Sequence, residues 1–265
     1  MSPLQSILFC ADCCFASVVG AVCGIGVGVI FEPVLYAFGW ASDSTSSFLS
    51  SCTVLAMSSY SVTKSIGAGD RLVRLKTGTP LAIGAAIGGI VGKQLFTGIA
   101  AFFPDPDQVG AVQALCLAII TCGTLIYSLR KDKIHTYTVT SAPICILIGM
   151  ALGICSSFLG IGGGPINLVV LYFFSSMDTK TAAANSLYII LFSQISSLIA
   201  TLLGGDVPDF TPFTLVVMVA GGILGGMLGR MWNRRLTNER VDRLFIILMM
   251  VIVGICIYNI VHYAG

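Results

Sequence analysis

Charged side chains are scarce in this chain of 265 residues: Asp, Glu, Lys and Arg make up 10% of it, against 56% hydrophobic residues. A soluble domain of this size needs a more polar surface, so a soluble fold is excluded. Several apolar stretches exceed the roughly 20 residues that a spanning helix needs, and the alternation typical of an outer-membrane barrel is absent. The composition therefore predicts an all-α, multi-pass protein of the cell (inner or plasma) membrane, in contact with the lipid bilayer.

Residues that commonly carry catalysis are also few. The chain has two histidines, His135 and His262, and no Walker phosphate-binding loop, so we expect no metal site, no histidine-based triad and no ATP hydrolysis. Its ten cysteines lie mostly within apolar runs and are expected to be packing residues. We expect neither an enzyme, a cofactor nor a nucleic-acid partner; a membrane-embedded enzyme or assembly factor that uses the cysteines is the alternative.

Lysine and arginine are absent from residues 1–63, and the basic residues that follow are clustered. The clusters lie at 64–76, 130–133 and 230–243. The positive-inside rule places all three in the cytoplasm and the acidic turns at 105–107 and 206–209 outside. This distribution constrains how many times each segment crosses the membrane.

Eight apolar segments are expected, four in each half of the chain. They lie at about 5–37, 47–66, 79–101, 109–129, 139–174, 182–204, 211–232 and 242–262. If each of the eight segments crossed the membrane once, the second and third basic clusters would lie on opposite sides, because three segments lie between them. We therefore predict that 139–174, which is too long for one crossing and is interrupted by glycines, forms a hairpin that enters and leaves on one side.

The first apolar segment, 5–37, is expected to form the same hairpin from the other side. Each half then has a glycine-broken helical hairpin followed by three transmembrane helices. The two repeats, 1–133 and 134–265, would be inverted with respect to each other within a single membrane domain, with both termini outside.

A glycine-rich motif in both halves is the basis for this repeat. Residues 24–38 read GIGVGVIFEPVLYAF, and residues 160–174 read GIGGGPINLVVLYFF. Glycine-broken segments at matching positions of two halves are typical of a transporter's substrate site. Pro165 favours a helix start, where free N–H groups attract anions. We expect the glycine turns of the two motifs to meet at the centre of the protein. The candidate substrate-binding glycines are Gly24, Gly26, Gly28, Gly162, Gly163 and Gly164.

Polar side chains within the apolar helices form a second group of candidates. Polar groups in lipid tend to face the protein interior, where they can hydrogen-bond an anion's oxygens or, alternatively, join helices. The candidates are Asn167, Asn185, Ser186 and Gln194 in the second half and Ser50 and Ser51 in the first. Glu32 is the candidate for binding a coupling proton.

Two further segments repeat small residues every four positions. They read GAAIGGIVGK at 84–93 and GGILGGMLGR at 221–230. Such faces let helices pack closely in lipid, within one chain or between two, so a homodimer stays open. Lys93 and Arg230 end the two faces, and we expect them to snorkel to the interface, with substrate steering as the alternative.

The motif LGIGGGPI at 159–166, with its partner CGIGVGVI at 23–30, resembles the TauE/SafE family of sulfite exporters. The segments NSL at 185–187 and SSC at 50–52 support the resemblance. It implies secondary transport of a small sulfur-containing anion: sulfite, thiosulfate, or a sulfonate such as sulfoacetate or sulfolactate. Alternating access with proton or sodium coupling is expected; an anion channel of the same fold, or a carrier of a non-sulfur organic anion, is the alternative.

Overall fold

The computed structural model describes residues 3–31, 43–69, 72–100, 106–159, 163–205 and 207–264, and no strand occurs among them. Its helices are α1 (Pro3–Cys23), α3 (Asp43–Gly67), α4 (Leu75–Ala100), α5 (Pro106–Arg130), the 3-10 helix η1 (Lys131–Lys133), α6 (Ala142–Leu159), α7 (Gly164–Ser175), α8 (Thr179–Gly204), α9 (Pro212–Arg235) and α10 (Asn238–Ala264). Among the described helices, Leu75–Phe96, Thr179–Gly204 and Pro212–Arg235 are each long and apolar enough to span a membrane. The predicted all-helical fold is confirmed.

Both predicted hairpins are broken at their glycines. In the second half α6 ends at Leu159 and α7 begins at Gly164. In the first half α1 ends at Cys23 and helical structure resumes at Gly28. Gly24 and Gly163 have φ angles of 76° and 67°, a left-handed conformation that glycine adopts without a steric penalty. The candidates Gly162 and Glu32 lie outside the described residues.

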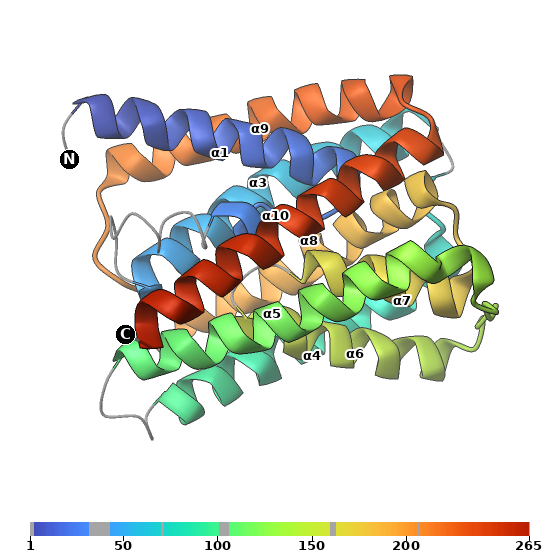
Figure 1. The fold of residues 1–265 in the computed structure, drawn as a ribbon, viewed down its shortest axis with the longest axis horizontal. Coiled ribbons are helices and arrows are strands. Elements are labelled where there is room, and N and C mark those ends of the chain that lie inside the picture. The colour runs from blue at the N-terminus through green and yellow to red at the C-terminus, as the bar shows by residue number, and fades with distance from the viewer. Residues whose placement is uncertain are drawn as a thin grey trace.

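The connections that carry basic residues share one end of the molecule. Figure 1 shows both termini at one end, and the α3–α4, α5–α6 and α9–α10 connections at the opposite end. We call the latter the basic end, because the basic segments 64–69, 72–76, 130–133 and 230–243 lie there. In the same view α1 begins at the end of the termini, whereas α6 begins at the basic end.

The glycine faces pack within the chain and join its two halves. The most extensive helix contacts are those of α4 with α6 and of α1 with α9. A Cβ built on Gly88 would lie 2.1 Å from the carbonyl oxygen of Met150, and one on Gly225 would lie 2.7 Å from that of Cys14. Met150 and Cys14 are equivalent in the repeat, since each lies ten residues before its glycine motif. The two halves therefore exchange equivalent contacts through their glycine faces.

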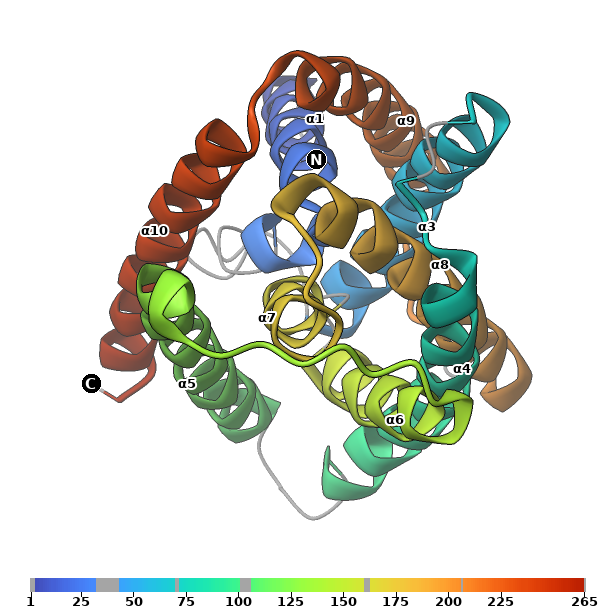
Figure 2. The same ribbon diagram turned by 90° about the vertical axis from the view of Figure 1, so that its right-hand side faces the viewer.

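The remaining helices enclose the centre of the bundle. Helix α3 packs against α8, and α5 packs against α10. Figure 2 shows α7 near the centre, surrounded by the longer helices. This arrangement places the start of α7, which follows the second glycine turn, in the interior of the protein.

Candidate functional site

The two glycine turns meet inside the bundle. A Cβ built on Gly164 would lie 2.5 Å from the Cβ of Ile25 and 2.7 Å from the backbone nitrogen of Gly26. A Cβ on Gly24 would lie 2.3 Å from the Cα of Ala183, on α8. Only glycine permits such close backbone approach, so the structure brings together the turns that the sequence repeat selects. Residues 24–31 and 163–165 are all buried.

The start of α7 presents backbone donors to this meeting point. The first N–H groups of a helix have no acceptor within the helix, and the helix dipole adds partial positive charge there. At this start Gly163 is the N-cap without a side-chain cap, and Pro165 occupies the first turn. The backbone N–H of Asn167 donates to the carbonyl of Gly163 at 3.2 Å. The geometry suits a small anion.

Four of the predicted side chains are buried with a polar atom that has no hydrogen-bond partner among the residues that the structure describes. These atoms are Asn167 Oδ1, Ser186 Oγ, Ser50 Oγ and Gln194 Oε1. The side chains are between 0% and 4% exposed. A buried polar group without a partner costs about 1–3 kcal/mol, and most such groups in native proteins are satisfied by a bound molecule or by the protein. These four atoms are therefore candidates for contact with a ligand.

Two of these side chains lie near the glycine turns, and Ser50 is the counterpart of one of them in the first half of the chain. Asn167 lies in the first turn of α7, which packs against α8. Ser186 follows Ala183 on α8 by three residues, so the two share a helix face, and Ala183 touches Gly24. Ser50 occupies the equivalent position on α3, since Ser50 and Ser186 each follow the first glycine of their motif by 26 residues.

Asn185 has a different role from its neighbour Ser186. Its Oδ1 accepts the backbone N–H of Arg74 at 3.0 Å, and its Nδ2 donates to the carbonyls of Leu72 and Thr181 at 2.8 and 2.7 Å. These bonds connect α8 to the segment before α4. Asn185 therefore has the alternative role expected of a buried polar side chain, which is to join helices. Ser51 is half-buried and is not among the buried hydroxyls without a partner.

Asn185→Leu is expected to destabilise the protein by about 1–3 kcal/mol, because it leaves backbone groups without their partner. Asn167→Leu removes an amide whose oxygen has no partner, so its stability should equal or exceed that of the wild type. Thermal unfolding of both variants in detergent checks this pair. If Asn167→Leu lowers stability as much as Asn185→Leu, the Asn167 amide serves the fold and not a ligand.

Arg230 and Lys93 differ in their surroundings although they occupy matching sequence positions. Arg230 donates to the carbonyls of Ser61 at 3.2 Å and Lys64 at 2.9 Å, near the C-terminal end of α3. Lys93 Nζ lies 5.6 Å from the centroid of the Phe96 ring. The guanidinium of Arg230 is therefore held against α3, which the sequence motif did not indicate.

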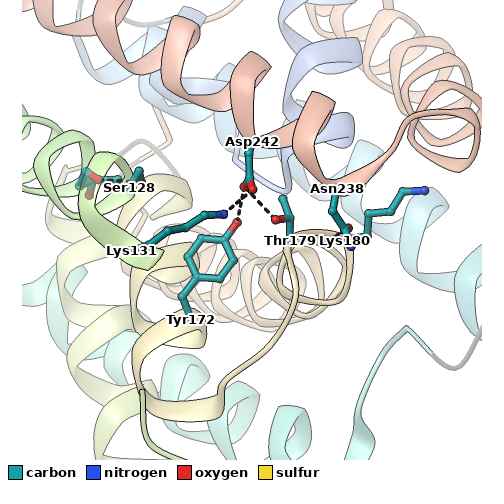
Figure 3. Close-up of polar contacts among 8 residues, drawn as sticks. Ser128, Lys131, Tyr172, Thr179, Lys180, Asn238 and Asp242 are labelled. Carbon is teal, nitrogen blue, oxygen red and sulfur yellow. Dashed lines mark hydrogen bonds and ion pairs between the residues drawn. The ribbon is translucent and has the colours of Figure 1, made fainter. Parts of the chain in front are cut away.

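A polar cluster that the sequence reading missed lies at the basic end (Figure 3). Asp242, on α10, forms an ion pair with Lys131 and accepts hydrogen bonds from Thr179 Oγ1 at 2.8 Å and from the Tyr172 hydroxyl at 3.5 Å. The Lys131 Nζ also lies 4.9 Å from the centroid of the Tyr172 ring. This cluster connects α10 and η1 to the end of α7 and the start of α8. Its sequence signal was an acidic residue, Asp242, within the basic segment 230–243, and this signal does not identify the partners of Asp242.

Comparisons with known proteins agree with this architecture. The family model described as "Sulfite exporter TauE/SafE" matches residues 9–256. The chain is 26% identical over 129 residues to the "Probable membrane transporter protein YunE" of Bacillus subtilis (strain 168), which covers 48% of this chain and 46% of that protein. It is 27% identical over 128 residues to the "Probable membrane transporter protein y4hK" of Sinorhizobium fredii, covering 47% of this chain and 50% of that protein.

The chain spans about half the length of the curated relatives it matches. No solved structure gives a significant match. The family model, in contrast, covers nearly the whole chain and includes both glycine motifs. The chain therefore belongs to the sulfite exporter TauE/SafE family, as a multi-pass membrane protein.

Proposed function

We propose that this protein is a secondary transporter that moves a small sulfur-containing anion across the cytoplasmic membrane by alternating access. The carrying observation is the set of buried polar atoms without partners beside two glycine turns that touch. Asn167, Ser186 and Ser50 supply an amide and two hydroxyls, and the start of α7 supplies backbone N–H groups. The family membership and the names of the relatives support transport as the activity.

Neutral donors suit a transported anion. A hydroxyl or an amide N–H donates to sulfite or sulfonate oxygens without a full positive charge. The atom of Asn167 without a partner is its carbonyl oxygen, so the amide must turn by about 180° for its N–H to face an anion. A carrier must bind its substrate tightly enough to select it and weakly enough to release it. None of the four candidates with unpartnered buried atoms carries a charge, which favours release.

The packing of the helices supports an inverted-repeat mechanism. Helices α1 and α6 begin at opposite ends of the molecule (Figure 1), and the halves exchange equivalent glycine contacts. In transporters with inverted repeats, one helix bundle rocks against another around a site at the membrane centre. Close-packed backbones transmit displacement, so α4 would move with α6, and α1 with α9. Each moving unit would then contain helices of both halves. Glu32 is the proposed coupling residue.

Counterflow in proteoliposomes tests the function. Vesicles loaded with sulfite, sulfoacetate or thiosulfate should show saturable counterflow of at least one of them, with sulfate and acetate as comparison anions. Ser186→Ala and Asn167→Leu should each reduce this flux by about tenfold, the value of one hydrogen bond to an anion. Thr201→Val is the matched control, because Thr201 is a buried hydroxyl on the same helix that already donates to the carbonyl of Ser197.

Two results would contradict the proposal. Flux without counterflow indicates a channel. Folded protein that moves none of the sulfur anions removes the substrate assignment.

A further inference from the structure

A pocket opens at the basic end, where residues of α1, α3, α8 and α9 come together. It encloses about 460 Å³ of space not occupied by atoms, part of it open to solvent. Three of its lining residues are basic: Lys180, Arg230 and Arg234. None of the described residues that line it is acidic. The pocket therefore attracts anions through its charge as well as through its shape.

Two of the basic side chains come from α9, which is fixed to its neighbouring helices. Arg230 and Arg234 lie one turn apart on α9, and Arg230 is held by the carbonyls of Ser61 and Lys64. Asn233, between them, donates to the carbonyl of Val22 at 2.7 Å and so fixes α9 to the end of α1. Figure 3 shows the Lys180 side chain pointing away from Asp242. The positive charge of Lys180 is thus directed away from the polar cluster around Asp242.

The other walls of the pocket are apolar and lead to the glycine turns. Ala183, Ala184 and Leu187 of α8 line it. Ala183 is also the residue that Gly24 touches, with a built Cβ 2.3 Å from the Ala183 Cα. The contact between Gly24 and Ala183 therefore separates this pocket from the candidate site at the centre.

We propose that this pocket is a second anion site, in which an organic anion with a sulfonate or carboxylate head and a short apolar stem binds before it reaches the glycine turns. The head would lie against Arg234 and Lys180, since a guanidinium matches two oxygens of such a group. The stem would lie on Ala184 and Leu187. An inorganic anion has no group for the apolar wall. The inference rests on the proposed transport function only in that the anion would occupy this pocket before it reaches the glycine turns.

Equilibrium binding of propane-1-sulfonate to the purified full chain in an uncharged detergent tests the proposal. We expect it to bind at least about tenfold more tightly than sulfate or 1-propanol, which lack the stem or the charge. Arg234→Gln and Lys180→Gln should each weaken binding about fivefold, as loss of one partly exposed ion pair does. Arg230 is left intact because it anchors α3.

Two further variants make the test specific. Arg243→Gln should leave binding unchanged, because Arg243 is exposed and does not line the pocket. Ala184→Phe should abolish binding by filling the pocket. Unchanged affinity in both Arg234→Gln and Lys180→Gln, or sulfate binding as tight as that of propane-1-sulfonate, would overturn the proposal.

An anionic lipid headgroup has the same chemistry, and bilayer composition distinguishes it from a free anion. In nanodiscs of phosphatidylcholine alone, propane-1-sulfonate should bind as in detergent, and added phosphatidylglycerol should leave its affinity unchanged. Competition by phosphatidylglycerol in the wild type, lost in Arg234→Gln, would assign the pocket to lipid and overturn the free-anion proposal. Asn167→Leu should keep this binding while losing flux, so failure of the transport proposal and failure of the pocket are distinguishable.

Discussion

Gly24→Ala is expected to reduce counterflow to below about one tenth of the wild-type rate, whereas Gly205→Ala should leave it nearly unchanged. Both glycines have left-handed φ angles, 76° and 72°, so alanine brings a similar backbone strain of about 1–2 kcal/mol at each position. They differ in what a side chain would meet. A Cβ on Gly24 would lie 2.3 Å from the Cα and 2.6 Å from the oxygen of Ala183, while Gly205 has nothing within 4 Å.

The comparison of Gly24→Ala with Gly205→Ala therefore separates the effect of a side chain on the close contact with α8 from its effect on the backbone conformation. Counterflow, normalised to the amount of monodisperse protein from size-exclusion chromatography, is the measurement. Gly164→Ala should behave like Gly24→Ala, because its Cβ would lie 2.5 Å from that of Ile25 and would push the two turns apart. Equal flux in Gly24→Ala and Gly205→Ala would show that the contact between the turn and α8 is not needed for transport.

The sequence predicted the helix breaks because glycine repetition is a local signal. The pair of motifs marked where α6 and α7 separate and where α1 ends, and apolar length marked the helices. The predicted helix boundaries agreed less well with the structure. Helix α3 begins at Asp43 and α10 at Asn238, before the apolar runs predicted from 47 and 242. The polar residues before each run form the first turn of the helix at the membrane surface.

Side-chain roles were less predictable, since they depend on contacts between distant segments. Asn185 and Ser186 are adjacent in sequence, yet Asn185 bonds to Leu72 and Arg74, while the Ser186 hydroxyl has no hydrogen-bond partner in the described part of the chain. The position of a residue on its helix does not identify which backbone group from another segment will face it. The pocket at the basic end was missed for the same reason: Lys180 and Arg234 come from different helices, and only the fold brings them to one cavity.

Gly88→Ala is expected to destabilise the protein by about 3 kcal/mol or more, and Gly123→Ala to stabilise it slightly. Both are helical glycines, for which alanine is intrinsically better by about 1 kcal/mol. Gly123 has nothing within 4 Å, but a Cβ on Gly88 would lie 2.1 Å from the carbonyl oxygen of Met150. Because that neighbour is backbone, α4 and α6 must separate, and overpacking of this kind costs about 1–3 kcal/mol and occasionally more.

Thermal unfolding in detergent and the yield of monodisperse protein measure this difference, whose sign should be opposite in the two variants. The repeat extends the argument to α1 and α9. A Cβ on Gly225 would lie 2.4 Å from that of Ser17 and 2.7 Å from the carbonyl oxygen of Cys14, so Gly225→Ala should also destabilise. Wild-type stability in Gly88→Ala would mean that the two helices are not in backbone contact. Wild-type stability in Gly225→Ala alone would mean that the halves do not exchange equivalent contacts, and the inverted repeat would lose its main support.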